Sequence, residues 1–148
     1  MDAIRHLTAD VAHAAASRAA QELARDSRVK LVYLFGSAAD PERKLVRDLD
    51  LAVLSDPPLS LDELMRLRAD AAATTGVPID LVSLNEASVV LAHEVAATGT
   101  CLYARDPDVE TEFITRARSR YWDFKPFLEE QWRLTGERLE ERRRGPQS

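Results

Sequence analysis

The sequence has little cysteine, glycine or aromatic character: one cysteine, five glycines and 6% aromatics in 148 residues. The single cysteine, Cys101, cannot form a disulfide within the chain, which excludes the small disulfide-stabilised folds of secreted proteins. No apolar run approaches the ~20 residues that a membrane-spanning helix needs. The first residues also lack the apolar stretch of a secretory signal. We therefore expect a cytoplasmic protein that makes no contact with membranes.

Internal repeats, low-complexity segments and Gly/Ser-rich linkers are missing as well, so the chain is expected to form one domain. Hydrophobic residues make up 45% and charged residues 30%, which is typical of a globular protein. The formal net charge is −5, from 20 Lys and Arg against 25 Asp and Glu. Because an acidic protein gains little from counterion release on a polynucleotide, direct nucleic-acid binding is not expected.

Hydrophobic periodicity and turn residues predict four helical segments and four short strands. The predicted helices run from Thr8 to about Arg28, from Ser60 to about Thr75, over Glu86–Thr98, and from Asp106 to about Arg144 with a kink or a break at Pro126. The predicted strands are Lys30–Phe35, Asp48–Leu54, Pro78–Leu84 and Cys101–Tyr103, with a polar connection at Ala38–Arg47. This order predicts an α/β (α+β) fold in which helices pack on a small mixed sheet.

Two carboxylates stand at the start of the second predicted strand. Residues two apart on a strand point to the same face, so Asp48 and Asp50 are expected to project together while Leu49 points away. The apolar residues that follow indicate a largely buried strand, where two neighbouring carboxylates repel each other and lose hydration. A hard divalent cation such as Mg²⁺ would relieve both costs, since it prefers oxygen ligands. The sequence therefore predicts metal-ligating roles for Asp48 and Asp50.

A third acid and a Gly-Ser turn complete the candidate site. Asp80 lies in an otherwise apolar strand, and three acids on neighbouring strands can hold two ions ~3.5–4 Å apart for an in-line phosphoryl displacement. Gly36 allows close approach of a ligand to the backbone, and the Ser37 hydroxyl with nearby N–H groups can donate to phosphates. Asp80 is expected either to act as a general base for an incoming hydroxyl or to complete the metal site.

These elements resemble the polymerase-β-like nucleotidyltransferase superfamily. Its sequence motif is a hydrophobic residue followed by Gly and then Gly or Ser (hG[GS]), about ten further residues, and two aspartates separated by one residue (DxD). The likeness is specific to the MNT-type minimal nucleotidyltransferases, the antitoxins of HEPN/MNT (HepT/MntA-like) toxin–antitoxin pairs, and it covers almost the whole chain. Its segments are LFGS at Leu34–Ser37, RDLDLAVL at Arg47–Leu54, VPIDLVSLNEAS at Val77–Ser88, HEVAATGTCLY at His93–Tyr103 and RYWDFKPFLEEQ at Arg120–Gln131.

The resemblance implies a two-layer α/β fold, with a nucleotidyltransferase core over residues 1–105 and a C-terminal helical extension of the same domain over 106–148. It implies ATP with Mg²⁺, and transfer of AMP to a tyrosine hydroxyl of a HEPN ribonuclease toxin encoded next to this protein. The phosphate-binding residues of the family fall on Gly36 and Ser37, and its acids fall on Asp48, Asp50 and Asp80.

One departure from the family concerns charge near the phosphates. Many relatives continue after Gly-Ser as x-Ala-Arg-Gly, whereas this chain has Ala38–Pro41, with an aspartate at position 40. Arg43, Lys44 and Arg47 are the candidates to supply the missing positive charge, and Arg47 is assigned to nucleotide binding.

Two other functions are consistent with the same residues. A non-catalytic antitoxin would neutralise its toxin by covering it, with the acids no longer used. A small-molecule nucleotidyltransferase, of the kind that acts on aminoglycosides, would need an acidic pocket for a cationic sugar. A test of AMP transfer to the adjacent toxin separates the first alternative from the enzyme.

The remaining side chains are expected to have structural roles. His93 is predicted to be a surface or partly buried residue, and Cys101 a small core residue. Trp122 and Trp132 fall outside the helical series expected to pack on the sheet, so they are interface candidates. That series has spacings of three and four and consists of Phe113, Ala117, Tyr121, Phe124 and Leu128.

Overall fold

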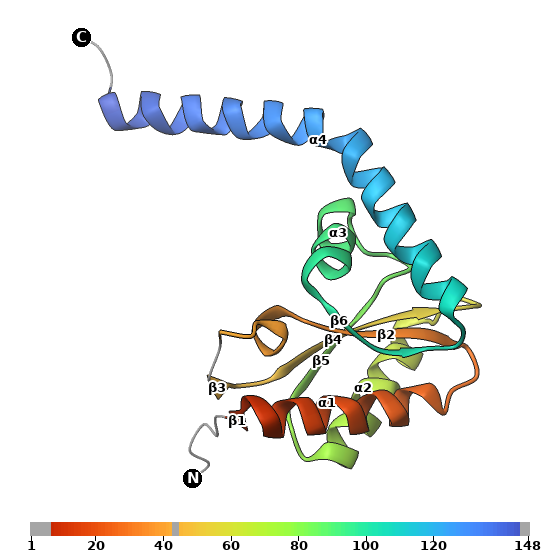
Figure 1. Cartoon of the computed structure of the whole chain (residues 1–148). Coiled ribbons are helices and arrows are strands. Elements are labelled where there is room, and N and C mark those ends of the chain that lie inside the picture. Colours follow the sequence, from red (N-terminus) through yellow and green to blue (C-terminus); the bar gives the residue numbers. More distant parts are fainter. Residues whose placement is uncertain (1–6, 43–44, 146–148) are drawn as a thin grey trace.

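A computed structural model describes residues 7–42 and 45–145 of the chain. Its helices and strands follow the predicted alternation, and Figure 1 shows their arrangement. The helices are α1 (Ala9–Ala24), a short 3-10 helix η1 (Gly36–Ala39), α2 (Leu61–Thr75), α3 (Val89–Thr98) and α4 (Pro107–Arg144). The strands are β1 (Leu7–Thr8), β2 (Val29–Phe35), β3 (Leu45–Val46), β4 (Leu49–Ser55), β5 (Ile79–Ser83) and β6 (Thr100–Ala104).

The central sheet is mixed, with the strand order β5-β4-β2-β6. β2 pairs antiparallel with both β4 and β6, whereas β4 pairs parallel with β5. A parallel pair needs a crossover, and α2 supplies it between β4 and β5. The predicted fold class, a small mixed sheet with helices packed on it, is confirmed.

One face of the sheet is covered by α1 and α2 (Figure 1). The buried face of α1 consists largely of alanines, which lets the helix backbone approach the sheet closely. Alternate residues of the strands point toward these two helices, because side chains alternate between the faces of a strand. On β4 these residues are Leu49, Leu51 and Val53, all fully buried.

The other face carries α3 and the first half of α4 (Figure 1). Its core includes Tyr33 of β2, Ala52 of β4, Val95 of α3 and Phe113 of α4. Helices therefore lie on both faces of the sheet, and the two-layer arrangement that the resemblance implied is wrong for this chain. Asp50 shares its strand face with Ala52, so it points to the side of the sheet on which α3 and α4 lie.

Several predicted boundaries differ from the structure. α1 ends at Ala24 rather than near Arg28, because the Asp26 carboxylate accepts a hydrogen bond from the backbone N–H of Arg28 and forms a turn. α3 begins at Val89 rather than Glu86, since the Ser88 hydroxyl caps it.

Two further differences lie near the candidate site. The segment predicted as an irregular polar connection contains β3, which pairs antiparallel with β1. The strand predicted from Asp48 begins at Leu49, so Asp48 lies in a bend just before the strand. A two-residue strand is too short to show periodicity in the sequence, which explains why β3 was missed.

α4 is one continuous helix of 38 residues that contains Pro126. Figure 1 shows it bending about half way along, so the predicted kink is confirmed and the alternative of a break is wrong. Phe113 and Ala117 are buried against the sheet side of the domain, but Tyr121 stacks on His93 of α3. The prediction that the whole aromatic series packs on the sheet is therefore wrong beyond Ala117. Within the described part of the chain, no helix is long and apolar enough to cross a membrane.

The start of α2 gives a direct test of helix capping. The Ser60 hydroxyl accepts from the backbone N–H of Glu63 at 3.1 Å, and the Glu63 carboxylate accepts from the backbone N–H of Ser60 at 2.9 Å. Ser60→Ala should lower the free energy of unfolding by about 1 kcal/mol, because it leaves one helical N–H without its partner. Chemical denaturation would measure the change. Ser119→Ala, at an exposed interior position of α4, is the control and should cost nothing.

Candidate active site

The turn after β2 brings the glycine of the Gly-Ser pair against Asp50. Gly36 has φ of +71°, in the left-handed region that favours glycine. A Cβ placed on Gly36 would collide with Oδ2 of Asp50 and would lie 3.3 Å from its Cγ. The turn therefore requires glycine for two reasons, its backbone conformation and the close approach of Asp50.

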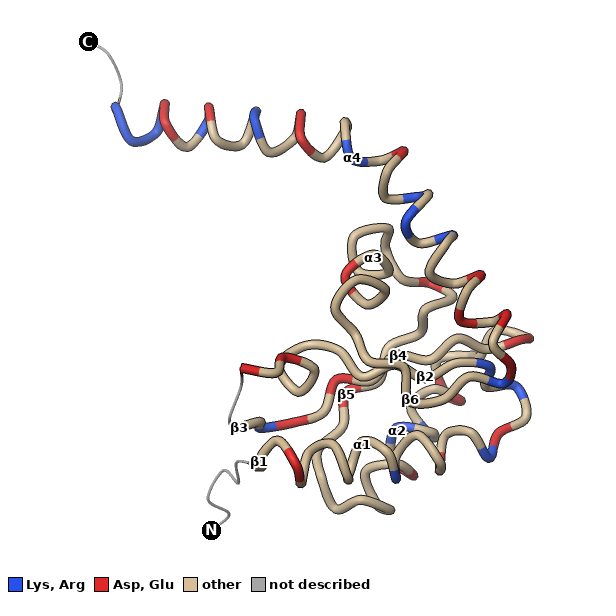
Figure 2. Tube along the Cα trace, viewed as in Figure 1, with Lys and Arg blue, Asp and Glu red and all other residues tan. Residues whose placement is uncertain are grey.

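Asp50 and Asp80 are direct neighbours across the sheet. They are paired in the register of the parallel strands β4 and β5, and residues paired in this way point to the same face. Asp50 also pairs with Phe35, the last residue of β2, so it lies between the Gly-Ser turn and Asp80. Figure 2 shows the acidic positions gathered where β4 and β5 begin. The register therefore brings Asp50 and Asp80 side by side at this end of the sheet.

The electrostatics of Asp50 reflect this crowding. Its pKa is raised above the ordinary value of an aspartate, first by desolvation on burial and then by the negative charges of Asp48 and Asp80. No carboxylate–cation contact offsets these effects, since within residues 7–42 and 45–145 Asp50 has no ion pair within 4.0 Å. The site therefore concentrates negative charge that a bound cation would neutralise.

The three acids differ in exposure. Asp50 is half-buried, whereas Asp48 and Asp80 are exposed. In the described part of the chain, no three His, Cys, Asp or Glu side chains are already arranged to hold a metal ion. The donor set consists of carboxylate oxygens, which are the ligands that Mg²⁺ prefers. Sharing one ion would require the exposed side chains of Asp48 and Asp80 to turn toward Asp50.

Two further segments that carry predicted site residues are η1 and the bend before β4. Ser37 follows Gly36 in η1 and is half-buried. Arg47 and Asp48 are exposed and line a hollow together with Pro78. Pro78 was not among the predicted site residues, because a proline before a strand carries no chemical signal. Arg43 and Lys44, the other candidates for a compensating charge, lie outside the described residues.

The residues assigned structural roles behave as expected. His93 is half-buried and stacks on Tyr121 with the ring centroids 3.7 Å apart. Cys101 is half-buried in β6, where burial and the charge of Glu110 raise the pKa of its thiol to about 11. A thiol with so high a pKa is a poor nucleophile at neutral pH, so Cys101 is not a candidate nucleophile.

A glycine turn at the end of β2, with carboxylates on β4 and β5 beside it, is the arrangement that the sequence led us to expect for a nucleotidyltransferase. The sequence comparison supports this class, because the family model "Polymerase beta, Nucleotidyltransferase" matches residues 18–108. The chain belongs to the polymerase-β nucleotidyltransferase family.

Among its relatives is the protein adenylyltransferase MntA of Shewanella oneidensis. The two are 32% identical over 102 residues, which cover 68% of this chain and 73% of that protein. A solved toxin–antitoxin structure with AMP-PNP is similar with a TM-score of 0.66 and 25% identity, covering 78% of this chain and 98% of that chain.

A complex of a tri-AMPylated Shewanella oneidensis HEPN toxin with an MNT antitoxin gives a TM-score of 0.64. Its identity to this chain is 24%, over 82% of this chain and 98% of that chain, so this likeness concerns the fold. This chain is therefore an MntA-like nucleotidyltransferase.

Proposed function

We propose that this protein is an antitoxin that transfers AMP from ATP to a tyrosine hydroxyl of a HEPN ribonuclease toxin, and that this modification neutralises the toxin. The observation that carries the proposal is the position of Asp50, which touches the Gly36 turn on one side and pairs with Asp80 on the other. The relationship to MntA, a protein adenylyltransferase, supports the acceptor class. The solved toxin–antitoxin structure with AMP-PNP supports an adenine nucleotide.

The turn at Gly36 and Ser37 would bind the triphosphate. Gly36 presents backbone without a side chain, and the Ser37 hydroxyl can donate to a phosphate oxygen. Arg47 lines a hollow with Asp48 and Pro78, so its guanidinium would offset part of the charge of a triphosphate bound beside these residues. This role for Arg47 compensates for Asp40, which stands where relatives have an arginine.

The acids would hold Mg²⁺ with the triphosphate, with Asp48 and Asp50 as its main ligands and Asp80 beside them. The ion would supply charge neutralisation at the phosphates and orient them for in-line attack. In the transfer, the acceptor hydroxyl oxygen forms a bond to the α-phosphorus, and the bond from that phosphorus to the bridging oxygen breaks. Pyrophosphate leaves with that bond's electron pair. Asp80, the exposed acid on the edge strand β5, would receive the hydroxyl proton.

Intact mass spectrometry tests this function. The purified protein is incubated with the HEPN protein encoded beside its gene, together with ATP and Mg²⁺. We expect the HEPN protein to gain the mass of one or more AMP groups, and peptide mapping to place them on a tyrosine. Omitting Mg²⁺, or replacing ATP by AMP, should abolish the gain.

The same reaction distinguishes the alternatives. A HEPN protein that keeps its original mass, and whose ribonuclease activity is nevertheless blocked, would show that the antitoxin acts by covering its partner. Labelling of an aminoglycoside in place of the protein would assign a small-molecule acceptor. Either result would contradict the proposal.

The C-terminal part of α4, residues 121–144, is proposed as the surface that holds the toxin, and we call it the arm. Figure 1 shows α4 projecting away from the sheet beyond the bend, so most of the arm lies clear of the rest of the domain. Its charges pair along the helix itself, as in Arg133 with Glu130 at 2.6 Å and Glu137 at 2.7 Å. Four of its large apolar side chains are exposed, namely those of Trp122, Phe127, Trp132 and Leu139. Trp132 follows Leu128 by four residues, so it extends the apolar series from which the sequence analysis had excluded it.

Trp122 and Trp132 should be the energetic centre of that interface. Their side chains are 73% and 59% exposed, and tryptophans at contact surfaces often dominate binding energy. Each Trp→Ala variant should weaken binding of the HEPN partner by about 10- to 100-fold without changing the unfolding transition, because neither side chain is part of the core. Titration calorimetry measures the affinity.

Leu61→Ala is the matched control for the tryptophan variants. Leu61 is 71% exposed, but it lies on α2, on the opposite side of the sheet from α4. Its substitution should leave the affinity unchanged. If both tryptophan variants bind the HEPN partner as tightly as Leu61→Ala does, the arm is not part of the interface.

A further inference from the structure

A second cavity lies at the opposite end of the sheet from the acids. It has a volume of about 380 Å³ and is lined by residues from the ends of β4 and β5 and from α3 and α4. Asp50 is near the start of β4 and Ser55 is its last residue, so the two ends are separated by roughly 17 Å of strand. The cavity is therefore separate from the proposed active site, although it opens on the same face of the sheet.

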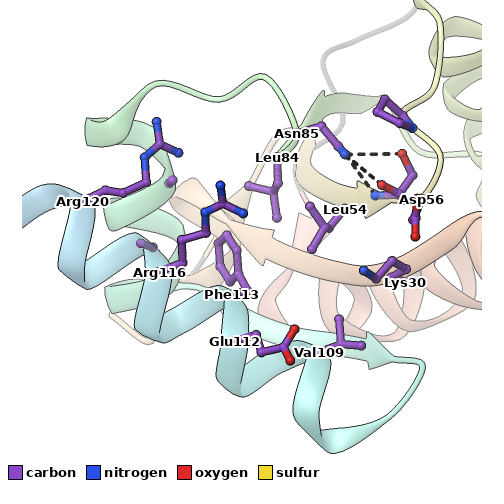
Figure 3. Close-up of a pocket in the computed structure, with 14 residues that line it drawn as sticks. Lys30, Leu54, Asp56, Leu84, Asn85, Val109, Glu112, Phe113, Arg116 and Arg120 are labelled. Carbon is purple, nitrogen blue, oxygen red and sulfur yellow. Dashed lines mark hydrogen bonds between the residues drawn. The ribbon is translucent and has the colours of Figure 1, made fainter.

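The floor of this cavity is apolar. Leu54 and Leu84 come from the sheet end, and Phe113 comes from the buried side of α4 (Figure 3). Asn85 fixes the sheet side of the cavity, because its amide donates to the Ser55 carbonyl at 2.8 Å and accepts from the Ser55 N–H at 3.0 Å. The floor is thus an apolar surface of the kind that accommodates a ring.

The rim carries three cations. Arg116 and Arg120 lie one turn apart on α4, and Lys30 comes from β2 on the other side (Figure 3). Among the described residues none of the three has a carboxylate within 4.0 Å. Like charges at this helical spacing repel each other, so the pair of arginines is more stable with an anion between them.

Two carboxylates, Asp56 and Glu112, also line the rim. They leave a net charge of +1, three cations against two anions, in a chain whose formal net charge is −5. A simple polyanion therefore fits less well than a ligand that combines an anionic group with hydrogen-bond donors. Carboxylates accept from hydroxyl and amino groups, which such a ligand would present to them.

We propose that this cavity binds a nucleoside monophosphate. Its phosphate lies between Arg116 and Arg120, whose planar guanidinium groups match phosphate oxygens. Its base lies on the apolar floor against Phe113, and its ribose hydroxyls donate to Asp56 or Glu112. The volume is within the range of small-ligand sites, ≈300–1,000 Å³. The site is independent of the proposed AMP transfer.

Nuclear magnetic resonance of the ¹⁵N-labelled chain, titrated with AMP in the presence of EDTA, tests the site. EDTA removes divalent cations, so the acidic site cannot hold the nucleotide through a metal. We expect shift changes at the amides of Leu54, Leu84 and Phe113 and none at Gly36 or Ser37. The combined variant Arg116→Gln and Arg120→Gln should weaken the apparent affinity at least about tenfold, since it removes two charge-assisted contacts.

Two controls separate this site from the other features of the protein. The matched pair Arg138→Gln and Arg142→Gln has the same spacing on the exposed arm and should leave the titration unchanged. Asp48→Asn with Asp50→Asn removes the proposed chemistry and should also bind AMP as before. Loss of AMP transfer and loss of this binding can therefore be told apart.

The remaining outcomes overturn the proposal. Shifts centred on Gly36 would place the nucleotide at the acidic site. Equal shifts with inorganic phosphate would show that the base contributes nothing and that the ligand is free phosphate. Absence of shifts at about 10 mM AMP, a concentration far above ordinary dissociation constants for such ligands, would show that the cavity binds no nucleotide.

Discussion

Asp50→Asn should reduce AMP transfer to the HEPN partner by about 10³-fold, the scale on which one preorganised electrostatic group contributes to a reaction. Asparagine keeps the shape of the side chain beside Gly36 but removes the charge that would balance a cation. The rate is measured by the mass gain of the HEPN protein at saturating ATP and Mg²⁺. Asp70→Asn, an exposed carboxylate on α2 on the opposite side of the sheet, should transfer AMP at the normal rate.

The same variant should be more stable than the parent protein in metal-free buffer at neutral pH. The folded-state pKa of Asp50 is raised, so the folded protein binds more protons than the unfolded chain between the ordinary and the raised pKa. The contribution of Asp50 to stability therefore falls as the pH rises through this window. An asparagine in its place does not titrate and has no such dependence. The stability difference between variant and parent should shrink as the pH is lowered, which urea denaturation at several pH values would show.

If Asp50→Asn transfers AMP at the normal rate, the proposed catalytic site at this end of the sheet is wrong. A variant that is less stable at neutral pH would show that Asp50 is paired with a cation of the chain rather than crowded by Asp48 and Asp80. The two measurements are independent, so each part of the argument can fail alone.

Gly36→Ala should abolish AMP transfer to a similar extent. A Cβ at this position collides with the carboxylate of Asp50, which must then leave its place between the Gly36 turn and Asp80. The positive φ of +71° adds a conformational cost of roughly 1–2 kcal/mol for any residue with a Cβ. The transfer assay measures the activity, and thermal unfolding shows how much of the loss reflects folding.

Gly76→Ala is a matched control for this substitution. Gly76 caps α2 with φ of +70°, nearly the same backbone conformation, but a Cβ there meets nothing within 4 Å. It should lose about the same conformational stability and keep its activity. Equal transfer by the two variants would show that the contact between Gly36 and Asp50 has no functional meaning.

Much of this architecture was predictable because its elements have strong local signals. The apolar strands ending at Phe35 and Leu54 and the helix capped by Ser60 were found close to their real bounds. The short strand β3 was missed because two residues carry no period. The helix after Glu86 was started too early, since Ser88 was not recognised as its cap.

The candidate site, like the fold, was predictable from the sequence only in part. The spacing of Asp48 and Asp50 and the Gly-Ser pair identified which residues were of interest, and the resemblance gave them roles. That Asp50 touches the Gly36 turn depends on the pairing of β2 with β4, which no local pattern reveals. No sequence pattern indicates the second cavity, because the residues that line it, such as Lys30, Leu84 and Arg116, come from three separate parts of the chain.

By itself, the sequence determined the types of chemical group, the helix and strand periods and the family, since these depend on residues that are near one another along the chain. Only the tertiary structure decided that Asp50 pairs with Asp80, that helices cover both faces of the sheet, and that α4 carries its exposed tryptophans away from the core. The physical reason is that strand register and helix packing arise from burial of side chains distant in sequence, and local propensity does not encode them.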